Sequence, residues 1–233
     1  IVEHSAKLLS KVKISGGGRC NVTHACFNIL QMSKRYPRGG NFVKKTFHHF
    51  FTNDTIDWFK QRGVGLKAEA DGPMFPITDS SQTIIDCLLR EADKYNVNIK
   101  MQCDIKHIER DNTCFKLLTS TGNEFKADYI CIATGGFPKA AMFDWITATG
   151  HTAAAPVPSL FTFNLPKHPI TKLMGVSVPD ALVKIIGTKL QQQGPVLITH
   201  WGLSGPGVLK LSAFAARELA EKNWEFSILI NWL

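Results

Sequence analysis

A run of three glycines followed by arginine, cysteine and asparagine is the part of this sequence best suited to bind a ligand. It reads Lys13-Ile14-Ser15-Gly16-Gly17-Gly18-Arg19-Cys20-Asn21-Val22-Thr23. Consecutive glycines let the backbone turn several N–H groups toward one point and approach a ligand closely, as in the nests that hold phosphates. Arg19 adds a charged fork suited to phosphate, and Asn21 and Thr23 add neutral hydrogen-bonding groups. A bare glycine run is also typical of a surface turn, but the residues that follow it favour a binding loop for an anionic ligand.

The segment matches neither of the two common phosphate-binding motifs. A Walker loop needs Gly-Lys-Ser/Thr where this chain has Arg19-Cys20, and a dinucleotide fingerprint needs Gly-x-Gly-x-x-Gly, of which the run supplies only the first half. The opening residues Ile1-Val2-Glu3 are typical of the end of an apolar strand closed by an acid. In dinucleotide-binding units, an acid at that place binds the ribose hydroxyls about 20 residues after the fingerprint. We therefore expect Glu3 to bind a ribose and the fingerprint to lie upstream of the first residue.

A second glycine turn follows a segment that is typical of a fully buried strand. Residues 129–133 are apolar and end in Thr134-Gly135-Gly136. Ligands collect beyond the carboxyl ends of parallel strands. Ala133, Thr134, Gly135 and Gly136 are therefore expected to line the side of a dinucleotide site that faces the first glycine run.

Four stretches of the sequence carry a resemblance to a known family. They are Ile14 to Thr23, Asp71-Gly72-Pro73-Met74-Phe75-Pro76, Ile130 to Gly136, and Thr199-His200-Trp201-Gly202-Leu203-Ser204-Gly205-Pro206. In this order they resemble the BaiN-like family of bacterial flavoproteins, also described as aminoacetone oxidase family FAD-binding enzymes or NAD(P)/FAD-dependent oxidoreductases. The chain departs from the family at Leu9-Ser10, where Gly-Arg is usual, and at His24, where asparagine is common. The family's N-terminal glycine fingerprint and closing flavin-contacting segment are not found, so we expect the middle of such a protein, incomplete at both ends.

The resemblance implies a flavin-dependent oxidoreductase that passes hydride between NAD(P)H, FAD and a small organic substrate. It implies that the adenine of FAD meets the backbone near Asp104-Ile105, and that the glycine segment surrounds the diphosphate and the flavin. The implied FAD contacts are Glu3, Lys11, Ser15, Gly16, Gly17, Gly18, Arg19, Cys20, Asn21, Thr23, Asp104, Ile105, Ala133, Thr134, Gly135 and Gly136. Family members are linked to reduction of unsaturated steroid ketones and to amine oxidation. The sequence does not choose between these substrates or between NADH and NADPH, and it identifies no catalytic residue.

The net charge of +8 is concentrated near the glycine run. Residues 1–50 hold nine of the 27 lysines and arginines and one of the 19 acids, so the rest of the chain is balanced. Such a basic field attracts diphosphate, the phosphate of NADPH or nucleic acid. The chain has no recognised motif that reads nucleic acid, so a basic nucleic-acid-binding module is the alternative hypothesis, and we expect only weak, salt-sensitive association. A third hypothesis is a truncated, inactive flavoprotein fragment that serves as a packing partner. We also expect the fragment to self-associate when it is made alone.

The six cysteines are scattered and form no Cys-x-x-Cys pair. Cys20, His24 and Cys26 have a spacing that fits no standard zinc pattern, so we expect no metal site. Free thiols are typical of a reducing cytoplasm, and the sequence has no apolar run long enough to cross a bilayer. These features predict a cytoplasmic protein without a membrane partner.

The elements that must position these residues predict an α/β fold. We expect a Rossmann-like FAD/NAD(P)-binding parallel sheet with a β-meander crossover in residues 1–152, followed by an inserted β-rich domain in residues 153–233. Helical spacing predicts two helices within residues 41–63, the second capped by Asn53-Asp54, and a third after Asp79 or Ser80. Alternation predicts strands at residues 64–66, 97–101, 105–110 and 114–119 and from Phe125.

The β-rich domain should contain several short strands and one helix. Strands are expected at residues 160–165, 176–178, 182–186, 196–199 and 224–232, and a helix over residues 206–222. The residues Gly202-Leu203-Ser204-Gly205-Pro206 are similar to a hydrolase nucleophile elbow with His200 as its base, but proline replaces the last glycine of that motif. We favour a helix start, with Gly205 or Ser204 as the cap and Pro206 in the first turn.

Overall fold

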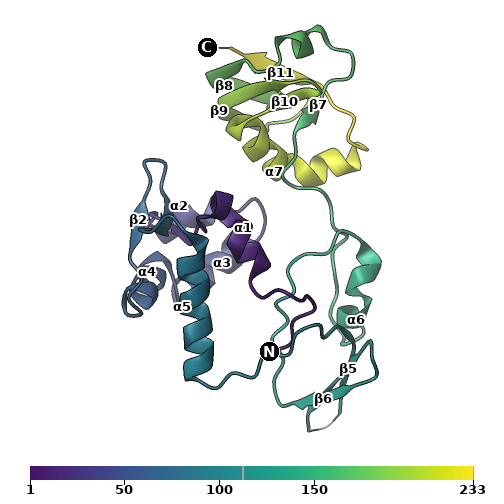
Figure 1. Ribbon diagram of the computed structural model, residues 1–233. Helices are drawn as coiled ribbons and strands as arrows, with labels where there is room; N and C mark the ends of the chain where they lie inside the picture. The colour runs from purple at the N-terminus through teal and green to yellow at the C-terminus, as the bar shows by residue number, and fades with distance from the viewer. Residues whose placement is uncertain (112, 233) are drawn as a thin grey trace. The chain divides into compact units, whose positions relative to one another are not determined.

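The computed structural model describes residues 1–111 and 113–232, which form two compact units (Figure 1). Unit 1 comprises residues 1–134 and 144–152, and unit 2 comprises residues 135–143 and 153–233. No helix in the described part of the chain is both long and apolar enough to span a bilayer.

The first part of unit 1 packs helices around a small antiparallel sheet. The helices are α1 (Ser10–Gly18), α2 (Ile29–Ser33), α3 (Gly40–Phe47), α4 (Thr52–Lys60) and α5 (Ser81–Lys94). The sheet has the order β1 (Thr23–His24), β3 (Pro73–Pro76), β2 (Leu66–Ala68). The core between them is formed by Cys20, Phe59, Val64, Ile84 and Cys87. Helices α4 and α5 thus bury the apolar stripes that their spacing predicts.

The predicted starts of two helices have different outcomes. Ser80 caps α5 by accepting a hydrogen bond from the backbone of Gln82, which confirms one of the two predicted caps. Helix α4 begins at Thr52, one residue before the predicted cap, so that prediction is wrong. Asp54 lies inside the first turn, where its carboxylate accepts the backbone N–H of Phe51 at 2.7 Å. The side chain that suggested a cap therefore acts from the third helical position.

The second part of unit 1 is the predicted β-meander. Strands β4 (Ile105–Arg110), β5 (Phe115–Thr119) and β6 (Glu124–Ala127) form an antiparallel sheet in chain order. The strand predicted at residues 97–101 is reduced to one parallel bridge between Val2 and Lys100. There, the N–H of Glu3 donates to the carbonyl of Lys100 at 2.8 Å, as expected if the first residues end a parallel strand.

The prediction of a buried strand at residues 129–133 is wrong. This segment has no regular secondary structure, and Tyr129 is 92% exposed. An apolar run becomes an inner strand only when neighbouring strands pair with both of its edges. In the described residues, the parallel pairing of unit 1 is limited to the bridge between Val2 and Lys100, so the segment has no such neighbours.

Unit 2 is a twisted antiparallel sheet covered by one long helix. The strands are β7 (Phe163–Asn164), β8 (Ser177–Ile185), β9 (Gln191–Thr199), β10 (Gly202–Ser204) and β11 (Ile228–Asn231), in the order β11-β8-β9-β10-β7. Strand β8 joins two strands that the sequence predicted separately. Helix α7 (Pro206–Glu221) packs on β9 and confirms the predicted helix. Its residues Val208, Leu211, Ala215 and Leu219 are buried against strand residues such as Val183 and Val196. Two short helices of this unit lie at Ala140–Phe143 and Pro169–Leu173, whereas α6 (Asp144–Thr147) belongs to unit 1.

The start of α7 decides between the helix and the hydrolase elbow. Gly205 is the N-cap and Pro206 the first helical residue, which confirms the helix start. A Cβ on Gly205 would lie 2.7 Å from the carbonyl oxygen of Pro195, and one on Gly207 would lie 3.1 Å from that of Gly194. The glycines therefore allow the helix to begin directly against β9.

One buried hydroxyl ties α7 to the start of the sheet. Ser212 is fully buried; its Oγ accepts the backbone N–H of Phe161 at 2.9 Å and donates to the carbonyl of Leu209 at 2.8 Å. The hydroxyl therefore has partners for its donor and for an acceptor site, as a buried polar group requires.

Candidate functional site

The glycine segment breaks the end of α1 into a chain reversal. Ser15 is extended with ψ 147°, and Gly16, Gly17 and Gly18 follow with φ of 55°, 68° and 87°. The N–H of Cys20 donates back to the carbonyl of Ser15 at 3.0 Å and closes the turn. Three successive residues with positive φ require glycine, because a Cβ would be strained at each of them.

The glycines differ in what surrounds them. A Cβ on Gly16 would lie 2.8 Å from the Phe75 ring and 2.9 Å from the backbone nitrogen of Asn21. A Cβ on Gly17 would meet no protein atom within 4 Å. Packing against the protein explains why residue 16 is glycine, whereas the backbone of Gly17 is open to an approaching ligand.

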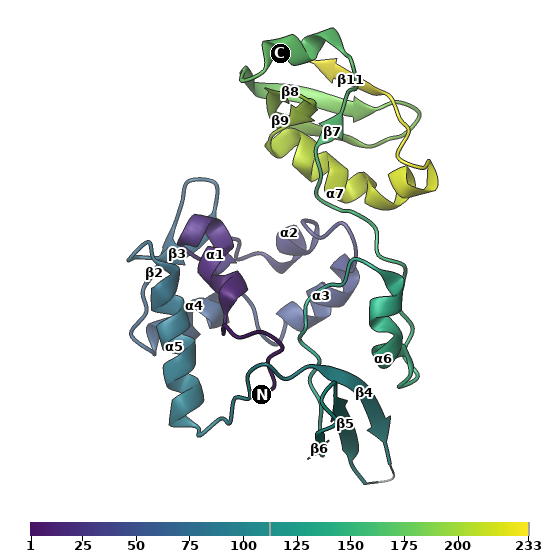
Figure 2. The same cartoon turned by 45° about the vertical axis from the view of Figure 1, so that its right-hand side comes forward.

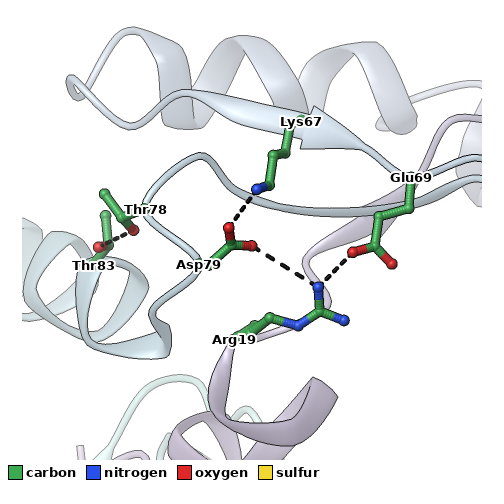
Figure 3. Close-up of polar contacts among 6 residues, drawn as sticks. All are labelled: Arg19, Lys67, Glu69, Thr78, Asp79 and Thr83. Carbon is green, nitrogen blue, oxygen red and sulfur yellow. Dashed lines mark hydrogen bonds and ion pairs between the residues drawn. The ribbon is translucent and has the colours of Figure 1, made fainter.

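Arg19 is held by acidic side chains of the protein (Figure 3). Its guanidinium hydrogen bonds to Glu69, lies 3.9 Å from a carboxylate oxygen of Asp79 and stacks 4.0 Å from the centroid of the Phe75 ring. The hydrogen bond with Glu69 is the main reason that the pKa of Arg19 is raised above its ordinary value. Lys67 forms a further ion pair with Asp79. The predicted role of Arg19 in binding phosphate stays a prediction, and a phosphate there would compete with two carboxylates.

The other residues of the segment divide into buried and exposed groups. Cys20 is 7% exposed and lies in the core of unit 1, and Thr23 pairs with Met74 in the small sheet. Ser15 donates its hydroxyl to the carbonyl of Val12 at 2.9 Å. The exposed residues include Lys11, Gly16, Gly17 and Asn21. Ligand contact is therefore best supported for the exposed members, while Cys20 anchors the loop.

The structure brings together the residues expected at the adenosine end. The N–H of Cys103 donates to the carbonyl of Glu3 at 2.9 Å, which places Asp104 and Ile105 beside the first residues of the chain. The Glu3 carboxylate accepts the N–H of Ser5 at 2.7 Å, and this bond is the main reason that its pKa is lowered. The predicted contact of these residues with adenosine stays a prediction.

The second glycine turn is exposed. Ala133, Thr134, Gly135 and Gly136 lie outside helices and strands, and the division into units falls between Thr134 and Gly135. The prediction that these residues face the first glycine run stays a prediction.

The sequence alone did not identify a polar cluster next to the glycine segment. The His24 ring packs on Gly72, where a Cβ would overlap it, and its Nε2 lies 3.0 Å from Nη1 of Arg35. Its Nδ1 is buried and has no hydrogen-bond partner among the described residues. The two signals in the sequence were His24 in place of the family's asparagine and the Asp-Gly-Pro turn at residues 71–73. Within the described part of the chain, no group of three or more His, Cys, Asp and Glu side chains is arranged to hold a metal ion.

Comparisons with known proteins match both units. The family described as "HI0933-like protein Rossmann domain" matches residues 1–156, and "HI0933-like protein barrel and H2TH domain" matches residues 157–233. These descriptions agree with the predicted Rossmann-like domain and β-rich domain.

Three curated relatives carry two different enzyme names. The chain is 30% identical to a ribosomal RNA dihydrouridine synthase of Escherichia coli (strain K12), over 92% of this chain and 54% of the relative. It is 26% identical to a protein of the same name from Haemophilus influenzae, over 92% and 55%. It is 24% identical to a 3-dehydro-bile acid delta(4,6)-reductase of Clostridium scindens, over 100% and 58%. The chain thus spans little more than half the length of these relatives.

Proposed function

This chain belongs to the HI0933-like protein family, and from that premise we propose that it is the core of a flavin-dependent oxidoreductase that reduces a carbon–carbon double bond. The names of the relatives support this reaction class. A dihydrouridine synthase adds two hydrogens to the uracil ring, and a delta(4,6)-reductase removes double bonds of a steroid that carries a 3-oxo group. Both names describe saturation of an alkene conjugated to a carbonyl. They therefore favour reduction over amine oxidation, the other activity linked to the BaiN-like family that the sequence resembles.

The observation that carries the proposal is the open backbone of Gly17. A cofactor diphosphate needs N–H groups that no Cβ shields, and the left-handed run at residues 16–18 with free space at Gly17 provides such a surface. Asn21 adds an exposed amide next to it. The fit is poorer at Arg19, whose guanidinium already has carboxylate partners.

Each group of site residues has a distinct task in this proposal. The backbone at Gly17 and Gly18 binds the FAD diphosphate, and Glu3 with the backbone at residues 104–105 orients the adenosine. The Arg19 ion pairs and the buried Cys20 hold the loop in one conformation, so that little conformational entropy is lost on binding. Bound FAD supplies transfer of hydride from NAD(P)H to the substrate. The six free thiols agree with a reaction in a bacterial cytoplasm.

A spectrum of the full-length natural protein tests the proposal. We expect the purified protein to be yellow, with flavin bands in the visible spectrum, and to release FAD rather than FMN when it is denatured. Anaerobic addition of NADH or NADPH should bleach these bands, and comparison of the two rates identifies the donor. A colourless protein that does not take up added FAD would refute the proposal.

A further inference from the structure

We propose that the exposed side chains of residues 27–50, here called the α2–α3 surface, bind single-stranded RNA. The inference rests on the proposed function, because it makes a base in an RNA chain the substrate of that reductase. Helices α2 and α3 lie next to each other in unit 1 (Figure 2). Charge, exposed aromatic rings and packing each contribute to the argument.

The α2–α3 surface is basic and has no acid. Residues 4–53 contain no Asp or Glu, and Lys34, Arg35, Lys44 and Lys45 are exposed. Lys34, Lys44 and Lys45 form no ion pair with any residue in 1–111 or 113–232, whereas Arg19 is neutralised by Glu69 and Asp79. Unpaired lysines beside each other are suited to a phosphate backbone, whose counterions they displace.

Four aromatic rings of the α2–α3 surface are also exposed. Phe42 is 74% exposed, Phe27 57%, Phe50 51% and Tyr36 42%. Several exposed rings gathered within 24 residues are typical of an interaction surface, whereas a single exposed ring is not. Nucleobases stack on aromatic side chains regardless of sequence, and lysines on the same surface bind the intervening phosphates.

The rings are held on a preformed support. A Cβ on Gly40 would lie 2.9 Å from the carbonyl oxygen of Ser33, so the start of α3 closely approaches the end of α2. The ring of Phe47 packs edge-on against Tyr36, with ring centroids 5.9 Å apart, and is tilted against Phe51, with centroids 4.8 Å apart. Because Phe47 faces inward, Phe42 on the same helix points away from this packing.

The same arrangement argues against a lipid surface. A helix that lies in a membrane interface has a continuous apolar face for the lipid. In α3, Val43 and Phe47 are partly buried and Phe42 is the exposed apolar residue, with Lys45 one turn further on the same face. In α2, Leu30 is 52% exposed and is followed four residues later by the exposed Lys34. Two relatives in addition have ribosomal RNA in their names. A base on a ring with a phosphate on the adjacent lysine fits this pattern better than a lipid does.

The test measures RNA binding and flavin chemistry on the same full-length protein. The probe is a fluorescein-labelled 12-nucleotide oligouridine, followed by fluorescence anisotropy at several salt concentrations. The variant is Phe42→Ser/Lys45→Ser. The matched control is Lys210→Ser/Phe214→Ser, which removes an exposed lysine and a 44% exposed phenylalanine from α7. Within each pair, the two side chains lie on the same face of their helix. The variant and the control therefore each lose one phenyl ring and one lysine.

We expect Phe42→Ser alone to weaken RNA binding roughly 5- to 150-fold without changing the salt dependence, because a stacked base is lost. Lys45→Ser alone should lower the salt slope by about 0.7, the value for one phosphate contact of a single strand. The control should bind RNA as the parent does, and all variants should keep the flavin spectrum and its bleaching by NAD(P)H.

Two other results would overturn the inference. One is equal RNA affinity for the parent, the variant and the control. The other is no RNA binding together with Phe42-dependent binding to phosphatidylglycerol vesicles, which would make the surface a lipid contact. In both cases a normal flavin spectrum leaves the proposed function standing. Absence of flavin refutes the proposed function whether or not RNA binds.

Discussion

Replacement of Gly17 by valine should separate the fold of the glycine segment from its ligand. The structure leaves the place of a Cβ at Gly17 empty within 4 Å, so an added Cβ clashes with no protein atom. The cost to the fold is the strain of φ 68°, about 1–2 kcal/mol for an L-residue in the left-handed region. For a chain of this size, such a loss lowers the melting temperature by roughly 2–8 °C.

The cost to the cofactor should be much larger. If the side chain prevents two backbone N–H groups from reaching a charged diphosphate, the loss is about 3–6 kcal/mol. That corresponds to roughly a 100- to 20,000-fold weaker affinity for FAD. The assay is titration of apoprotein with FAD, followed by quenching of flavin fluorescence, with thermal unfolding measured on the same samples.

Gly187→Val is the matched control for this substitution. Gly187 has φ 79° and also has no atom within 4 Å of a Cβ, but it lies in the turn between β8 and β9 of unit 2. It should therefore lose similar stability and retain the affinity for FAD. Equal FAD affinity for Gly17→Val and Gly187→Val would show that the glycine run is a surface turn and that the cofactor site has been misplaced.

Three further predictions concern buried groups and pH. Ser212→Ala should destabilise the fold by about 1–3 kcal/mol in urea unfolding, because a buried N–H loses its acceptor; an unchanged midpoint would contradict this. Cys131 is exposed and Cys87 is 1% exposed with a pKa raised by burial, so iodoacetamide should label Cys131 first, as mass spectrometry of the peptides would show. The N–H of Ser5 lowers the pKa of Glu3 from its ordinary 4.5. The stability that this hydrogen bond gives the folded protein is therefore fully present above pH 4.5 and is lost as the pH falls through the lower pKa of Glu3 in the folded state. Relative to the intrinsic exchange rate at each pH, the N–H of Ser5 should therefore be more protected from hydrogen exchange above this range than below it, and this difference should disappear in Glu3→Gln.

Regular elements with local signals could be predicted from the sequence. The helices α5 and α7 bury the residues that their 3.6-residue spacing selects, and the meander β4–β5–β6 follows its alternation. Helix α3 forms where its spacing predicts a helix but buries none of its residues, and Phe42 is exposed. The strand expected at residues 129–133 failed because pairing partners, rather than local composition, decide whether an apolar run becomes a strand. Strand β3 (Pro73–Pro76) was missed for the converse reason, since two prolines hide a segment that pairs on both sides with short strands.

The candidate site was predicted only in part. The conformational need for glycine at residues 16–18 follows from residue type alone, and positive φ at all three agrees with it. The partners of Arg19 could not be predicted, because Glu69 lies 50 residues away in the chain and no local pattern connects the two. A guanidinium fork has the same shape for a carboxylate as for a phosphate, so the sequence cannot distinguish an ion pair of the protein from a ligand contact.

The glycines at the start of α7 bear on how enzyme names are transferred between relatives. Gly205 and Gly207 are needed because a helix begins directly on β9, and this requirement is independent of any substrate. A short signature of this kind can persist through a change of chemistry, since selection on packing alone maintains it. Its presence in a newly sequenced genome would identify the architecture. It would not distinguish an enzyme that acts on ribosomal RNA from an enzyme that acts on a steroid. Assignment of a reaction to such a sequence has to rest on positions that the fold leaves free to vary, such as exposed rings and unpaired cations.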